Sequence, residues 1–154
     1  MSFENKEELS SIINDLSQSI YKHNSKVGWW DDLDLKRGLI DGISKDDELS
    51  EDTKSELLNS INISIDLIKT QKLALVHSEI SEALEGLRKD LKDDHLPRYE
   101  MFEVELADAI FRILDLAGAF NIPIGNIMME KWDYNTKRVD HTRAHRSGTN
   151  GKKF

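Results

Sequence analysis

Apolar positions recur every three or four residues along most of this chain, which is the spacing of an amphipathic α-helix. In residues 3–23 they form one stripe, made up of Leu9, Ile12, Ile13, Leu16 and Ile20. Ser2 precedes this segment and suits the N-cap position, where a hydroxyl accepts a backbone hydrogen bond. Prolines stand only at positions 97 and 123, and long stretches contain no glycine. The pattern therefore predicts an all-α protein.

Four further helices are expected, over residues 33–43, 51–89, 99–120 and 124–138. The second of these four is either continuous or broken near residues 59–62. Residues 45–52 are acidic and should be solvated, and residues 90–98 read as a polar loop. Residues 139–154 form a basic, glycine-containing tail that we expect to be extended. Together the elements predict a four- to five-helix bundle in one domain, residues 1–154.

The two longest helices carry the widest apolar stripes. The expected core positions are Leu73, Val76, Ile80, Ala83, Leu84 and Leu87 on one, and Phe102, Leu106, Ala109, Ile113, Leu116 and Phe120 on the other. A further stripe consists of Leu57, Ile61, Ile65 and Ile68. One thin bundle cannot bury this much apolar surface, so we expect a homo-oligomer, either a dimer or a tetramer.

Two acidic pairs lie beside these stripes, Glu79-x-x-Glu82 and Glu105-x-x-Asp108. Residues three apart share a helix face, so each pair presents two carboxylates side by side. Each pair sits roughly 100° from the centre of its core stripe, so antiparallel packing would bring both pairs to one cleft. Four converging carboxylates need a hard cation, Mg²⁺ or alternatively Mn²⁺, and such sites commonly serve phosphate chemistry. Di-iron bundles require a Glu-x-x-His motif, which this sequence lacks.

The amino-acid composition argues against some classes of binding partner. The net charge of −8 argues against binding a nucleic-acid polymer, which needs basic surface, but a metal-bound nucleotide remains compatible. No apolar run approaches the roughly 18 residues of a membrane span, so no membrane association is expected. The N-terminus is polar, unlike a signal peptide, and cysteine is absent. A cytoplasmic location is therefore expected.

Residues 75–85 and 103–108, which contain the acidic pairs, resemble the MazG-like all-α nucleoside triphosphate pyrophosphohydrolases. That family carries an ExxE motif and an ExxD motif, here separated by 22 residues. Residues 130–138 look like the family's K-x-x-Y-N-x-x-R helix, and residues 28–31 are similar to a G-[FW]-W-D segment of single-domain members. The resemblance covers about half of the chain, from residue 73 onward, and touches the final Gly-Lys-Lys-Phe. The segment 33–70 is longer than expected for compact members.

The resemblance implies hydrolysis of a nucleoside triphosphate between the α and β phosphates, giving a monophosphate and pyrophosphate. Two or three Mg²⁺ ions would be held by Glu79, Glu82, Glu105 and Asp108, with Glu79 or Glu82 acting as the base toward a bound water. The predicted phosphate ligands are Lys131, Asn135 and Arg138, which share one helix face. Arg112 either contacts phosphate as well or pairs with Asp108 or Asp115. Trp29, Trp30 and Tyr134 are candidates for contact with the base.

Two other interpretations stay open. The acidic stripes are solvated faces of a non-enzymatic helical-bundle interaction protein, or the enzyme releases inorganic phosphate instead of pyrophosphate. The base is not readable from the sequence; dGTP or dCTP is the first choice of substrate, in a role that controls or cleans the nucleotide pool.

Overall fold

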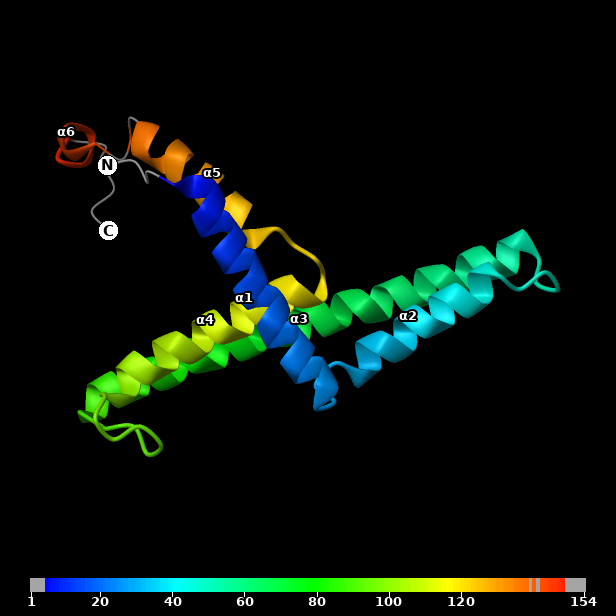
Figure 1. Ribbon diagram of the computed structural model, residues 1–154, viewed down its shortest axis with the longest axis horizontal. Helices are drawn as coiled ribbons and strands as arrows, with labels where there is room; N and C mark the ends of the chain where they lie inside the picture. The colour runs from blue at the N-terminus through cyan, green and yellow to red at the C-terminus, as the bar shows by residue number, and fades with distance from the viewer. Residues whose placement is uncertain (1–4, 139, 141, 149–154) are drawn as a thin grey trace.

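Helices account for nearly all of the regular structure in this computed structural model, which describes residues 5–138, 140 and 142–148 (Figure 1). In chain order they are α1 Lys6–Lys26, α2 Asp31–Ser44, α3 Glu51–Lys89, α4 Met101–Ala119, α5 Ile124–Lys137 and α6 Arg143–Arg146. The all-α prediction is confirmed. Within the tail that we expected to be extended, α6 forms a single short turn of helix.

The start of α1 differs from the prediction, and the structure decides between the two alternatives left open for α3. α1 begins at Lys6, later than predicted, because Asn5 is its N-cap and accepts a hydrogen bond from the backbone of Glu8 at 3.4 Å. The predicted cap Ser2 lies outside the described residues. α3 is unbroken through residues 59–62, since asparagine inside a helix costs only a few tenths of a kcal/mol that packing can offset.

α3 is the longest element and has different partners along its length (Figure 1). Its 39 residues extend roughly 58 Å at 1.5 Å per residue. The C-terminal half packs against α4, and the N-terminal half pairs with α2 to form an arm that leaves the rest of the molecule. α1 crosses α4 and also packs along α5. The arm is thus only two helices thick.

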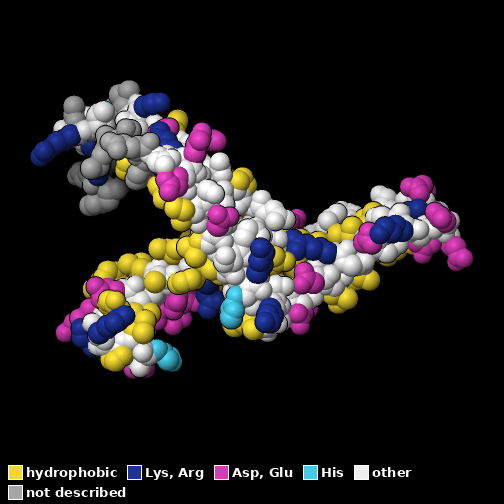
Figure 2. Space-filling model, in the orientation of Figure 1, with side chains coloured by type: hydrophobic (Ala, Val, Ile, Leu, Met, Phe, Trp, Pro, Cys, Tyr) yellow, Lys and Arg dark blue, Asp and Glu magenta, His cyan; other side chains and the backbone are white. Residues whose placement is uncertain are grey.

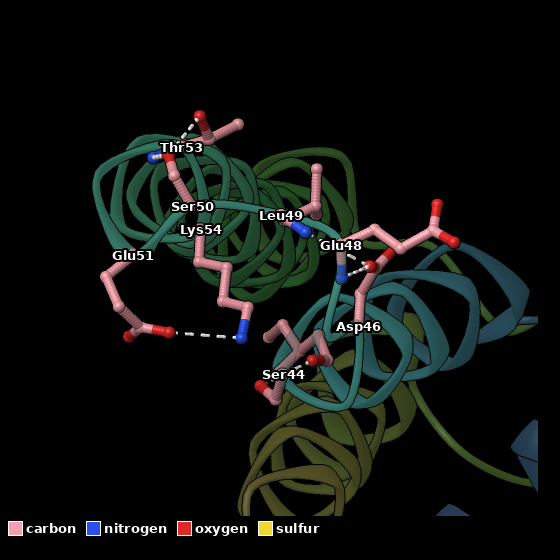
Figure 3. Close-up of polar contacts among 9 residues, drawn as sticks. Ser44, Asp46, Glu48, Leu49, Ser50, Glu51, Thr53 and Lys54 are labelled. Carbon is pink, nitrogen blue, oxygen red and sulfur yellow. Dashed lines mark hydrogen bonds and ion pairs between the residues drawn. The ribbon is translucent and has the colours of Figure 1, made fainter.

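A capped turn joins the two helices of the arm at its tip (Figure 3). The carboxylate of Asp46 accepts hydrogen bonds from the backbone N–H groups of Glu48 at 2.8 Å and Leu49 at 3.3 Å. Ser50 then caps α3, because its hydroxyl accepts from the backbone of Thr53 at 3.3 Å. The acidic segment between α2 and α3 is mostly exposed, as expected, and these contacts fix its conformation.

Small residues set the crossing of α1 over α4. The hydroxyl of Ser17 donates to the carbonyl of Leu114 at 2.6 Å, and Ser17 is almost fully buried. A Cβ atom at Gly118 would collide with the Ser17 carbonyl, so only glycine allows this approach. The buried residues of α1 are therefore Ser10 and Ser17, whereas Ile12 and Leu16 of the predicted stripe are exposed.

Between α3 and α4, half of the predicted core positions are also exposed, whereas Leu116 and Phe120 do pack against the buried cluster. Ala83 and Ala109 are buried, but the leucine-rich positions face outward in this chain: Leu73, Ile80, Leu84, Leu87, Leu106 and Ile113 are all exposed. Figure 2 shows hydrophobic side chains on the surface along α4. The seam itself is built from small residues, and a Cβ on Gly86 would lie 2.9 Å from the Met101 side chain. Close approach through this small-residue face leaves the bulky side chains outside.

The largest buried side chains lie where α1, α2, α3 and α4 meet. Trp30 and Leu33, near the start of α2, are each 1% exposed and contact Ala119 at the end of α4. The Trp30 ring meets those of Tyr21 and Phe120 edge to face, at centroid distances of 5.9 and 6.2 Å. This cluster holds the arm to the body of the molecule.

Among the described residues, no single helix is long and apolar enough to cross a membrane. Only the pair α4 and α5 taken together meets that test of length and composition, and the two helices are bent by 116° at the break between them.

Candidate metal centre and adjoining cleft

Three carboxylates converge at the seam between α3 and α4. Oxygen atoms of Glu79 on α3 and of Glu105 and Asp108 on α4 all lie within 4.8 Å of one another. Glu79 is 5% and Glu105 is 8% exposed, whereas Asp108 faces solvent. Hard divalent cations prefer clustered carboxylate oxygens of this kind.

The electrostatics of the cluster favour a cation. Burial raises the pKa of Glu105 to about 7, helped by a hydrogen bond with Glu79 and by the negative charges of Glu82, Glu79 and Asp108. The pKa of Asp108 is also raised, first by burial and then by the charge of Glu79. Buried carboxylates that repel one another are costly without positive charge nearby. These three side chains therefore fit a divalent cation.

Glu82, the fourth predicted ligand, lies beside the triad of Glu79, Glu105 and Asp108 and is exposed. It is close enough for its charge to raise the pKa of Glu105. Because α3 and α4 approach through the Glu79 face, that carboxylate is enclosed, whereas Glu82 stands at the edge of the same seam. The geometry thus separates two buried carboxylates from two that are open to solvent.

Arg112 reaches across the seam instead of pairing along its own helix. Its Nε donates to Oε1 of Glu79 on α3, rather than to Asp108 or Asp115 one turn away. The guanidinium charge also opposes the upward shift of the Asp108 pKa. Arg112 consequently places a positive charge beside the triad.

A cleft of about 610 Å³ adjoins the triad between α1, α3 and α4. Asp108 and Arg112 line it near the triad, and Trp29 lines it as well. The remaining lining comes from Ser19, Ile20, His23, Asn24 and Val27 near α1, Lys72 and Leu75 on α3, and Phe111 and Asp115 on α4. The volume lies within the roughly 300–1,000 Å³ of small-molecule sites.

The two adjacent tryptophans occupy different environments. Trp30 is enclosed by the aromatic cluster, and its Nε1 donates to the buried carboxylate of Asp115 at 2.9 Å. Trp29 is 57% exposed and lines the cleft. Of the two predicted base-contact residues, Trp29 therefore offers an accessible aromatic face and Trp30 belongs to the core.

Lys72 is a cleft residue that the sequence motifs did not indicate. Its Nζ donates to the carbonyl of Trp29 at 3.0 Å and lies 4.1 Å from the centroid of the Trp30 ring. Burial lowers its pKa, and the charge of Asp115 opposes that shift. Lys72 precedes Glu79 by seven residues, which is two helical turns, so this spacing could have placed it on the face of the metal ligands.

The predicted phosphate ligands of α5 lie apart from this cleft. Among the described residues, neither Lys131, Asn135 nor Arg138 lines it, and neither does Tyr134. α5 packs along α1 and turns away from α4 (Figure 1). Lys131 and Arg138 stack on the exposed Tyr134 ring, 4.8 and 5.4 Å from its centroid. Within one chain, α5 does not bring these groups to the triad.

Comparison with protein-family models, with curated proteins and with solved structures gives no match to this chain.

Proposed function

We propose that the protein is a Mg²⁺-dependent nucleoside triphosphate pyrophosphohydrolase. The observation that carries the proposal is the juxtaposition of two features: a triad of carboxylates, two of them buried, and a nucleotide-sized cleft with an exposed tryptophan and two cations. A metal cation held by this triad, beside the exposed Trp29 ring, suits a ligand with a phosphate chain at one end and a base at the other. The acidic motifs and their family resemblance point the same way.

The proposed roles follow the order of groups along the cleft. Glu79, Glu105 and Asp108 hold the cation, and the exposed Glu82 either completes the set or orients the attacking water. Arg112 and Lys72 are cations placed to bind phosphate oxygens by charge-assisted hydrogen bonds. Trp29 stacks on the base. A bound Mg²⁺ supplies a more acidic water and neutralises phosphate charge.

In this reaction water attacks the α phosphorus and the bond from that phosphorus to the bridging oxygen breaks. The products are a nucleoside monophosphate and pyrophosphate. Phosphate binding by Lys131, Asn135 and Arg138 would need α5 of a second copy, or a movement of α5, because these residues do not line the cleft of their own chain.

Burial supports this function over an interaction protein with solvated acidic faces. The carboxylates of a solvated acidic face should be exposed to water, yet Glu79 and Glu105 are almost completely covered. Retaining two buried carboxylates at a helix seam costs stability unless a cation compensates. Glu85 on the same helix shows the contrast, since its side chain is 42% exposed and pairs with the neighbouring side chains of Arg88 and Lys89.

The function is tested by separating the products of a nucleotide panel. Canonical and modified ribo- and deoxynucleoside triphosphates, beginning with dGTP and dCTP, are incubated with protein and Mg²⁺ or with EDTA. We expect Mg²⁺-dependent release of pyrophosphate and a monophosphate. Release of inorganic phosphate would assign a different phosphohydrolase, and no turnover of any nucleotide would contradict the proposal.

Glu105→Gln is the informative variant, with Glu85→Gln as its matched control at a partly exposed position outside the triad. Loss of a carboxylate ligand should abolish pyrophosphate release in the first and leave it near wild type in the second. Circular dichroism checks that both variants remain helical. Full activity in Glu105→Gln would remove the triad from the reaction.

A further inference from the structure

Arg112 stands between the triad and the cleft and contacts both. Its Nε donates to the buried Glu79, and the residue also lines the cleft beside Asp108. The Arg112 side chain is 34% exposed and that of Glu79 only 7%, so the arginine reaches inward from the cleft to a covered carboxylate. The pair joins residues on different helices, α4 and α3.

Its contact with Glu79 puts the guanidinium where it competes with an incoming cation. Oε1 of Glu79 accepts from Arg112, and the same carboxylate belongs to the triad. A divalent cation at the triad would repel the guanidinium strongly, because both charges would share a largely buried carboxylate. The accessible direction for the displaced side chain is the cleft that it already lines.

We propose that Arg112 is a substrate-phosphate ligand held on Glu79 in the cation-free protein and released into the cleft when the cation binds. This inference rests on the proposed function. It makes phosphate binding depend on the cation twice, once through the cation's own charge and once through the freed guanidinium. Cation-free protein therefore disfavours nucleotide binding.

A purely structural ion pair would behave in the opposite way. If Arg112 only positioned Glu79, removing it would disorder a ligand and weaken cation binding. If Arg112 competes with the cation, removing it should tighten cation binding. The two cases differ in sign, so a binding measurement without any nucleotide separates them.

The first experiment measures Mn²⁺ affinity by calorimetry on wild type, Arg112→Gln and Lys72→Gln. Lys72→Gln is the matched control, since it removes a nearby positive charge that does not contact the triad. Loss of a charge-assisted hydrogen bond corresponds to roughly 10- to 150-fold, so Arg112→Gln should bind Mn²⁺ at least about 10-fold more tightly. Lys72→Gln should change the affinity less than about 3-fold. Unchanged or weaker binding in Arg112→Gln, or equal tightening in both variants, overturns the inference.

The second experiment observes the pair directly in wild-type protein, so it does not depend on a variant folding. The ¹⁵N resonance of the Arg112 Nε–H group is assigned by its absence in Arg112→Lys. Addition of Mg²⁺ should shift this resonance and speed its exchange with water as the bond to Glu79 breaks. A resonance that stays in place at saturating Mg²⁺ contradicts release.

The third measurement concerns phosphate and uses inorganic tripolyphosphate as the probe. With Mg²⁺ present, Arg112→Gln should bind it roughly 10-fold more weakly than wild type, and with EDTA the two should be equal. Equal binding under both conditions overturns the inference while leaving pyrophosphate release by wild type to support the proposed function. Absence of any Mn²⁺ or Mg²⁺ binding by wild type would overturn both.

Discussion

At the scale of single residues, the most consequential group is Glu105, because its charge state should link stability to binding of the proposed cation. Its pKa is raised from 4.5 to about 7, mainly by burial. The folded protein therefore binds this proton more tightly than the unfolded chain does. The contribution to stability is fully present below pH 4.5 and is lost as the pH rises through about 7.

This sign gives a pH prediction for the metal-free protein. In EDTA, the Tm of wild type should fall relative to that of Glu105→Gln between pH 4.5 and about 7, since glutamine keeps the neutral form. Thermal unfolding of both proteins across that range measures the difference. Mg²⁺ should raise the wild-type Tm more at pH 8 than at pH 6, because the ligand must be ionised. Parallel Tm profiles for the two proteins would contradict the assignment.

The hydrogen bond between Trp30 and Asp115 yields a second prediction. Trp30→Phe keeps an aromatic ring in the core but leaves the buried Asp115 carboxylate without its donor. An unpaired buried polar group costs about 1–3 kcal/mol, and the smaller ring adds to that loss. Urea unfolding gives the free energy directly. Trp29→Phe is the control at an exposed neighbouring position and should change stability by less than about 0.5 kcal/mol.

At the scale of helices, periodicity predicted the elements well and their inward faces poorly. The spacing of apolar residues located every long helix, with boundaries within three residues of those observed. It could not decide which face of α3 is inward, because Leu84 and Leu87 satisfy a core pattern as well as any buried residue does. The decisive residues were Ala83 and Gly86, whose small size carries little hydrophobic signal but allows α4 to approach.

At the candidate site, too, the sequence predicted what depends on helical spacing but not what depends on how the helices pack together. The spacing of Glu79, Glu105 and Asp108 predicted that these carboxylates would meet, and their oxygens do converge. The partner of Arg112 was not predictable, since Glu79 becomes its neighbour only through the register of α3 against α4. The departure of α5 from the cleft likewise depends on the 116° turn after α4, which no motif encodes.

The close approach of α3 and α4 can be tested at Gly86. Alanine there would place a methyl group 2.9 Å from Met101, so the helices must separate. Overpacking of this kind costs typically about 1–3 kcal/mol, and separation should also loosen the triad and weaken Mn²⁺ binding. Gly38→Ala is the matched control on α2, where nothing lies within 4 Å of the added atom.

Gly38→Ala should stabilise the protein slightly, whereas Gly86→Ala should destabilise it. Alanine is favoured over glycine inside a helix by up to about 1 kcal/mol, so Gly38→Ala should raise the Tm slightly and leave Mn²⁺ affinity unchanged. Thermal unfolding and calorimetry on the two variants make the comparison. Equal effects of the two substitutions would show that helix propensity, and not packing, determines the outcome at Gly86.

At the scale of the whole molecule, the exposed surface is larger than that of a typical folded monomer of this mass. The chain exposes 11569 Å², whereas a folded monomer of 17.7 kDa exposes about 7,900 Å², an excess of roughly 3,600 Å². Bulky side chains contribute to that excess on several helices at once: Leu16 on α1, Leu67 and Leu84 on α3, and Ile110 on α4. Obligate homodimers bury about 2,000–5,000 Å² of such surface in total.

These exposed stripes lead to the prediction that the protein is a homo-oligomer that packs through the outer face of α3 and α4. Light scattering at micromolar concentration should give at least twice the 17.7 kDa of one chain. Leu84→Glu places a charge on the leucine stripe, the exposed positions Leu73, Ile80, Leu84 and Leu87 of α3. It should shift the mass toward a single chain, because burying an unpaired charge is costly. Ser81→Glu adds the same charge at an exposed polar position on α3 and should leave the assembly intact.

A wild-type mass of 17.7 kDa would contradict the assembly outright. Dissociation of both variants would show that added charge on α3 disrupts it wherever it is placed, and not that the leucine stripe is the interface. If Leu84→Glu alone dissociates, measuring its pyrophosphate release tests whether a single chain is sufficient for activity. The triad and Arg112 lie within one chain, but Lys131, Asn135 and Arg138 do not reach its cleft. A dissociated variant that binds Mn²⁺ normally yet hydrolyses no nucleotide would identify the second copy as the source of phosphate-binding groups.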